Sequence, residues 1–156
     1  MTHTAVLLYV RTVWSKMTKN QKQDAVLSCA VTAVFFATVI GVWGVWYRTN
    51  DDAILSNIAF GAYGPDRVHL VYVNILYGWL LRGLQCLNDS LNWFALSQVG
   101  VLYASTAVLT YYGIRHWGRL RGAVLAAAMM AAFGANVLFR IQYTQTAALA
   151  LCAGLV

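Results

Sequence analysis

An uninterrupted apolar run from Ala25 to Tyr47 constrains the possible folds of this chain more than any other feature. The run contains no charged residue, and about 20 consecutive apolar residues suffice for an α-helix to cross the hydrocarbon core of a bilayer. Trp43, Trp46 and Tyr47 gather at its end, as aromatic residues do where a helix meets the headgroup layer. The run therefore predicts a transmembrane helix.

The composition of the whole chain also indicates a membrane protein. Hydrophobic residues make up 60% of the 156 residues and charged residues only 10%, whereas soluble domains carry about 25% charged residues. The net charge of +6 is spread over short stretches between apolar runs, which is typical of topology signals rather than of a nucleic-acid interface. We therefore expect membrane lipids as partners and no nucleic acid. The cysteines and histidines are dispersed, and their spacing predicts no metal site.

These patterns predict an all-α, polytopic helical membrane protein. Residues 1–24 form a basic leader that is expected to stay in the cytoplasm, and residues 25–156 form one transmembrane domain. Spans are expected at about 25–47, 93–114 and 122–139, and residues 143–156 begin a further apolar run. Because that last run is too short to cross a bilayer, we interpret the chain as the N-terminal part of a longer protein. The alternative is a complete short chain with a half-inserted tail.

The segment 68–86 allows two topologies, since it is long enough to span but carries a polar stripe at helical spacing. The stripe consists of Asn74, Gly78, Arg82 and Gln85. If the segment spans, the strongly basic loop at 115–121 lies outside, against the positive-inside rule. If it is instead an interfacial or re-entrant helix in the first outer loop, the basic loop is cytoplasmic. The charge rule therefore favours the second topology.

Asp51 and Asp52 follow the first apolar run directly, although the chain contains only five acidic residues. Exposed to water, one of them would cap a short helix over residues 53–60. Facing a cleft, the pair would serve as a general base or bind a divalent cation. The favoured topology places residues 140–146 on the same side of the membrane as these carboxylates. One cap accounts for only one of the two acids, so we take both as candidate catalytic residues.

An ordered set of motifs resembles those of GT-C-type membrane glycosyltransferases, and more closely those of GtrII-like bacterial polytopic proteins. The set covers about two thirds of the chain. Its members here are Asn50-Asp51-Asp52, Gly61-Ala62-Tyr63, His69 to Leu81, Asn92-Trp93 and Arg140 to Ala147. The resemblance implies a protein of the bacterial cytoplasmic membrane that takes a sugar from a polyprenyl-phosphate carrier and transfers it to a glycan acceptor on the outer face. The alternative is a non-catalytic transporter, flippase or accessory subunit of surface polysaccharide assembly.

Sugar transfer from a lipid phosphate needs a base for the acceptor hydroxyl and a positive charge for the leaving phosphate. Asp51 or Asp52 suits the first role, with a divalent cation at the pair as a further option and no other cofactor expected. Arg140 suits the second role because guanidinium matches phosphate geometry. The remaining candidates are Arg82 and His69 for phosphate, and Gln142, Tyr143 and Asn74 for lining the substrate site. Arg82 and Arg140 also fit a simpler role as anchors in the headgroup layer.

Overall fold

The computed structural model describes residues 11–47, 50–62, 64 and 74–156. This part of the chain is helical apart from two short strands and the connections, so the predicted all-α class is confirmed. Residues 11–16 form a helical turn ahead of the named elements. The elements that follow are α2 (Lys19–Trp43), β1 (Trp46–Tyr47), α3 (Asn50–Ala59), α4 (Ile75–Leu87), α5 (Trp93–Trp117), α6 (Arg119–Met129), the π-helix η1 (Met130–Gly134), α7 (Ala135–Phe139), β2 (Arg140–Ile141) and α8 (Tyr143–Gly154).

Three helices are long and apolar enough to cross a membrane: α2, α5, and the continuous helix Arg119–Phe139 made of α6, η1 and α7. They lie at the predicted spans. The further apolar run at 143–156 forms α8, which has only twelve residues. At a rise of about 1.5 Å per residue α8 is roughly 18 Å long, shorter than the hydrocarbon core of a bilayer.

The ends of α2 differ from the predicted range of 25–47. The helix begins at Lys19 because Thr18 and Gln21 form a capping box: the Thr18 hydroxyl accepts from the Gln21 N–H and the Gln21 side chain accepts from the Thr18 N–H. It ends at Trp43, where Gly44 takes a positive φ of 72° that favours glycine. Trp46 and Tyr47 consequently belong to a strand and not to the helix.

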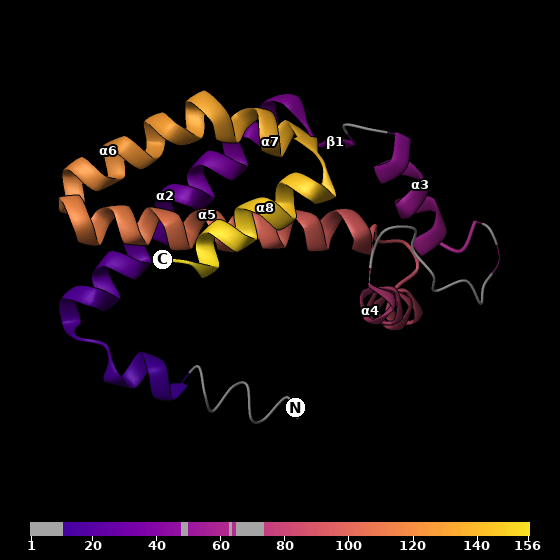
Figure 1. Ribbon diagram of the computed structural model, residues 1–156, viewed down its shortest axis with the longest axis horizontal. Helices are drawn as coiled ribbons and strands as arrows, with labels where there is room; N and C mark the ends of the chain where they lie inside the picture. Colours follow the sequence, from indigo (N-terminus) through magenta and orange to yellow (C-terminus); the bar gives the residue numbers. More distant parts are fainter. Residues whose placement is uncertain (1–10, 48–49, 63, 65–73) are drawn as a thin grey trace.

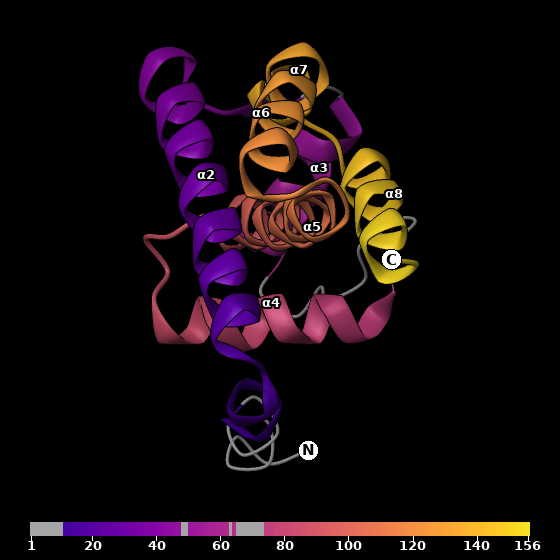
Figure 2. The ribbon, with the colours of Figure 1, turned by 90° about the vertical axis from the view of Figure 1, so that its left-hand side faces the viewer.

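The long helices pack around α5. Figure 2 looks along α5 and shows α2, α6–α7 and α8 on three sides of it, and α5 contacts α2, α6 and α8. The chain direction of α2 and α6–α7 is opposite to that of α5 and α8 (Figure 1). Two ends of the bundle result. The arginine end comprises the start of α2 and the α5–α6 junction, and the acidic-pair end comprises β1, β2, α3, α4 and the starts of α5 and α8.

The α5–α6 junction depends on a close approach between two helices. Gly118 turns the chain with a φ of 85°. A Cβ atom on Gly122 would lie 2.5 Å from the Cα of Ile114 and 2.6 Å from the carbonyl oxygen of Gly113. Since real Cβ atoms do not come this close to backbone, only glycine at position 122 allows the two helices to pack in this way. Small residues at such contacts are the usual basis of helix packing in lipid.

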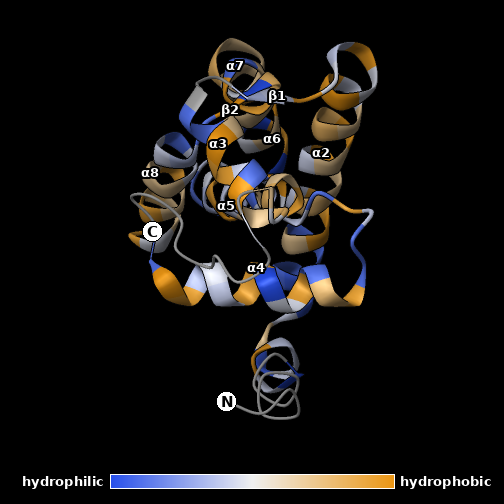
Figure 3. Ribbon diagram, turned by 90° about the vertical axis from the view of Figure 1, so that its right-hand side faces the viewer, coloured by the Kyte–Doolittle hydropathy of each residue, from blue (hydrophilic) through white to orange (hydrophobic). Residues whose placement is uncertain are grey.

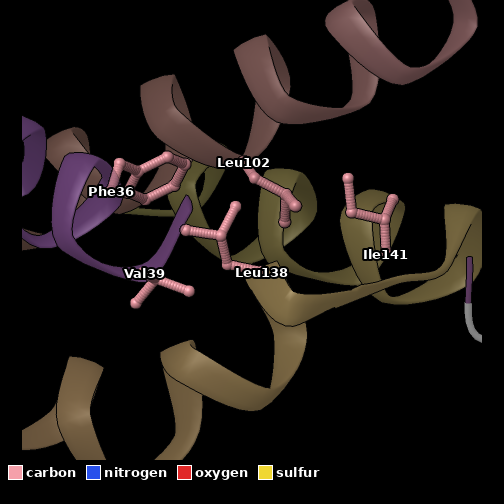
Figure 4. Close-up of a cluster of buried hydrophobic side chains, with 5 residues drawn as sticks. All are labelled: Phe36, Val39, Leu102, Leu138 and Ile141. Atoms are coloured by element: carbon pink, nitrogen blue, oxygen red, sulfur yellow. The ribbon is translucent and has the colours of Figure 1, made fainter. Parts of the chain in front are cut away.

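The main hydrophobic cluster lies between α2, α5 and the segment leading into α8. Figure 4 shows its five buried side chains, Phe36, Val39, Leu102, Leu138 and Ile141. Ile141 belongs to β2, which pairs in parallel with β1 so that Trp46 lies opposite Arg140 and Tyr47 opposite Ile141. The cluster and the strand pair together join the exit of α2 to the start of α8 at the acidic-pair end.

The helix α4 has a different direction from the long helices. It is seen end-on in Figure 1, where α5 lies lengthwise, and lengthwise in Figure 2, where α5 is seen end-on. Its thirteen residues extend over roughly 20 Å, less than the hydrocarbon core of a bilayer. The residues of the predicted polar stripe have different environments: Gly78 and Gln85 are buried, Arg82 is half-buried and Asn74 is exposed.

Candidate functional site

Asp52 is fully buried and holds the start of α8. It lies in the first turn of α3, which begins at Asn50 and so includes both acids of the pair rather than starting after them. Its Oδ1 accepts a hydrogen bond of 3.0 Å from the backbone N–H of Tyr143, the first residue of α8. The residue at the N-cap position, Gln142, makes no side-chain cap hydrogen bond. Asp52 therefore supplies to α8 the carboxylate that a helix N-terminus favours, from a position far away in the sequence.

Asp51 precedes Asp52 in the same turn of α3 and has the opposite environment. Its side chain is exposed, and an acid in the first turn of a helix is favoured by the helix dipole. Of the two carboxylates, only that of Asp51 is therefore exposed to the surroundings in this structure. The prediction that one member of the pair caps a helix over residues 53–60 is wrong, because α3 already begins at Asn50; Asp52 instead accepts from the start of α8.

Arg140 lies on β2 with an exposed side chain. Its guanidinium carbon is 5.8 Å from the centre of the Phe139 ring. Together with Trp46, Tyr47 and Phe139 it lines a pocket of about 330 Å³. The strand pairing between β1 and β2 creates this combination, because it places Trp46 opposite Arg140. One arginine and three aromatic residues thus line this open pocket.

A hydrogen-bond network, not foreseen from the sequence, fixes α3 and β1 to the start of α5. The Asn92 Nδ2 donates to the Tyr47 hydroxyl at 2.9 Å and to the Ser56 Oγ at 3.1 Å. The Asn92 Oδ1 accepts from the backbone N–H of Ala95 at 2.9 Å and so caps α5. One residue therefore caps a helix and joins three elements. The local sequence signal for its capping role is an asparagine placed directly before a long apolar run.

A second network connects α4 to α5. The Tyr77 hydroxyl is hydrogen-bonded to the Ser97 Oγ, and the Gln98 Nε2 donates to the same hydroxyl at 3.3 Å. The buried Gln85 donates to the backbone carbonyl of Asp89 at 2.9 Å in the link between the helices. These contacts hold α4 across the end of the bundle.

The other predicted site residues have varied positions. Asn74 caps α4, its Oδ1 accepting from the Leu76 N–H at 2.8 Å. Arg82 is half-buried on α4, and Gln142 and Tyr143 are half-buried at the start of α8. His69 lies outside the described residues. The structure thus brings Asp52 and Tyr143 into contact, and it places Asp51 and Arg140 at the same end of the bundle (Figure 3 looks onto this end).

An ion-pair cluster dominates the opposite, arginine end. The buried carboxylate of Asp24 accepts from the Arg119 Nε at 2.6 Å and from the Arg115 Nη1 at 3.1 Å. The Arg119 Nη2 also donates to the Gln23 Oε1 at 2.8 Å. Both arginines remain about half exposed, at 45% and 49%. The sequence signal for this cluster is a lone acid at the start of an apolar helix in a chain with a strongly basic loop.

Among the residues that the structure describes, no three histidine, cysteine, aspartate or glutamate side chains gather in a way that would hold a metal ion. The divalent cation suggested for Asp51 and Asp52 stays a prediction. Comparison of the chain with protein-family models, with curated proteins and with solved structures gave no match.

Proposed function

We propose that this chain is a membrane protein whose acidic-pair end binds a polyprenyl-phosphate-linked sugar, and that it acts as a GT-C-type, GtrII-like glycosyltransferase or as part of one. The observation that carries the proposal is the pocket of Arg140, Trp46, Tyr47 and Phe139 at the same end as the exposed Asp51. A guanidinium binds phosphate through charge-assisted hydrogen bonds. Aromatic rings offer apolar faces against which a sugar can pack.

In this proposal Asp51 is the general base. It accepts the proton of the acceptor hydroxyl as that oxygen attacks the anomeric carbon of the sugar. The bond from the anomeric carbon to the phosphate oxygen breaks, and the phosphate leaves with the electron pair. Arg140 stabilises the negative charge that develops on it. Arg82 and His69 remain further candidates for the phosphate, and Asn74, Gln142 and Tyr143 for lining the substrate.

The direction of α4 supports an outward-facing site. A helix of this length that crosses the bundle end at a steep angle fits the plane of a membrane surface, as an interfacial helix in the first outer loop would. The basic residues of 115–121 then lie at the other end, together with the start of α2. This arrangement agrees with the positive-inside rule when the N-terminus is cytoplasmic. The acceptor would accordingly be a glycan outside the bacterial cytoplasmic membrane.

One observation favours the alternative of a non-catalytic transporter, flippase or accessory subunit of polysaccharide assembly. Asp52, one of the two candidate catalytic acids, is buried and bonded to the start of α8. Its presence at this position has a structural explanation. Catalysis would then depend on Asp51 alone, and an exposed acid at a helix start is common without any catalytic role.

The experiment measures transfer of a labelled sugar from polyprenyl phosphate to surface glycan by membranes that contain the full chain. The Asp51→Asn and Arg140→Gln variants should each lower the rate by about 100-fold or more, the size typical of a lost general base or a lost charge stabiliser. The matched controls are Asp89→Asn, another exposed acid at the same end, and Arg11→Gln. Wild-type rates in both test variants would refute the catalytic role and favour the alternative.

A further inference from the structure

A half-open apolar cavity of about 540 Å³ runs along the α6–α7 helix, whose lining residues Met129 and Phe133 are exposed. This volume is within the range of about 300–1,000 Å³ found for small-molecule sites. Residues of α2, α5, α6, η1, α7 and α8 line it. They extend from Gly113, Trp117 and Gly122 at the arginine end to Val137 and Leu138 near the acidic-pair end. The cavity therefore follows most of the length of a candidate membrane span.

The lining is suited to hydrocarbon and not to water. Apart from the indole of Trp117, the polar side chains of its lining are Thr106 and Thr110, and the Thr106 hydroxyl already donates to the Leu102 carbonyl at 2.7 Å. A water held in this lining would need two to four polar partners, whereas an apolar ligand needs none. The π-helix η1 contributes Met130, Phe133 and Gly134 to the wall, and such π-bulges are frequent at functional sites.

The charge around the cavity differs between its ends. At the arginine end, Arg115, Arg119 and Arg121 flank the lining residues, and Asp24 is the acid that pairs with the first two. Arg121 is exposed, and the described residues give it no carboxylate partner within 4.0 Å. At the acidic-pair end, Arg140 on β2 shares the end of the bundle with Asp51 and Asp52 on α3. Among the residues that the structure describes, an excess of positive charge therefore adjoins the cavity at the arginine end only.

We infer that the cavity holds one hydrocarbon chain of an anionic phospholipid whose phosphate lies at the arginine end, beside Arg121. The apolar lining of the cavity suits the hydrocarbon chain of the lipid, and the excess positive charge suits its phosphate. Basic residues at a membrane surface attract anionic lipid headgroups in this way. This site is separate from the pocket at Arg140 and does not depend on the proposed transfer reaction.

The test uses the full chain purified in detergent, with phosphatidylglycerol and phosphatidylcholine that carry the same acyl chains. Native mass spectrometry should show tighter binding of phosphatidylglycerol. A photoreactive group on its acyl chain should cross-link to residues between 102 and 138 that line the cavity away from its exposed side, such as Met130 and Val137. Equal binding of the two lipids, or cross-links confined to residues outside the cavity, would overturn the inference.

Two variants with matched controls sharpen the test. Ala126→Phe fills the cavity and should weaken binding of both lipids by about tenfold, as expected when roughly two methylene groups are expelled. Its control is Ala128→Phe on the exposed face of the same helix. Arg121→Gln should weaken only phosphatidylglycerol, by about fivefold, and Lys16→Gln should change neither lipid. Unchanged lipid binding by Ala126→Phe would contradict the inference. A wild-type dimer that Ala126→Phe dissociates would also contradict it, because a second copy of the chain would then fill the cavity in place of a lipid. If Ala126→Phe does not fold, the cross-links on the wild-type chain decide.

Discussion

Replacing Asp52 tests the most unexpected contact of the acidic-pair end. Asp52→Ala leaves the backbone N–H of Tyr143 without its carboxylate partner and removes a negative charge from the start of α8. Hydrogen bonds to charged groups contribute about 1.5–3 kcal/mol, and helix caps about 0.5–2 kcal/mol. These ranges describe the same interaction and are not added. We expect Asp52→Ala to lower the free energy of unfolding by about 2 kcal/mol.

Two further variants separate the effect of the charge from that of the cap. Asp52→Asn keeps an oxygen acceptor that caps as well as aspartate but loses the negative charge, so it should lose only about 1 kcal/mol. Asp51→Ala removes an exposed carboxylate and should change stability by less than about 0.5 kcal/mol. The measurement is reversible unfolding of the full chain in mixed micelles, followed by circular dichroism. Equal losses for Asp52→Ala and Asp51→Ala would show that the contact with α8 does not stabilise the fold.

Three other substitutions test the packing away from this contact, in the same unfolding measurement. Asp24→Ala should destabilise the chain by about 2 kcal/mol, because it leaves two arginines without their shared partner. Because the acid is buried, the difference in stability between wild type and variant should stay the same at high salt, and a difference that disappears at high salt would contradict this. Gly122→Ala should cost about 1–3 kcal/mol through the clash with the backbone of α5, whereas Gly100→Ala, with open space around it, should be neutral or slightly stabilising. Asn92→Ala should cost about 2 kcal/mol from the lost cap and network, and an equal effect of Asn57→Ala on the exposed side of α3 would disprove this reasoning.

The long helices were predictable because their signal is local. An uncharged apolar run longer than a bilayer core has few alternatives to a helix, and α2, α5 and α6–α7 lie where such runs occur. The start of α2 at Lys19 was missed although the sequence contains its signal. Thr18 and Gln21 have the spacing of a capping box, and this motif can extend a helix into polar residues ahead of an apolar run.

The contacts between the ends of the helices were predictable only in part. The expected topology placed residues 140–146 on the same side as the acidic pair, and the structure does bring Tyr143 to Asp52. That Asp52 is buried and Asp51 exposed does not follow from the sequence, because adjacent residues on a helix take opposite environments according to what packs on them. The cluster of Asp24 with Arg115 and Arg119 could not be predicted from the sequence either. Its partners are distant in sequence, and only the packing of α2 against the α5–α6 junction brings them together.

The proposed outer site requires that the two ends of the bundle face opposite sides of the membrane, with the acidic-pair end outside. Cysteine labelling tests this most directly, in a chain whose free cysteines Cys29, Cys86 and Cys152 are replaced by alanine. Single exposed cysteines are then introduced as Asp89→Cys at the acidic-pair end or as His116→Cys at the arginine end. A membrane-impermeant maleimide added to intact cells should label position 89, and should reach position 116 only after the membrane is permeabilised. Labelling of position 116 in intact cells, with position 89 protected, would contradict the proposed orientation and the outer site with it.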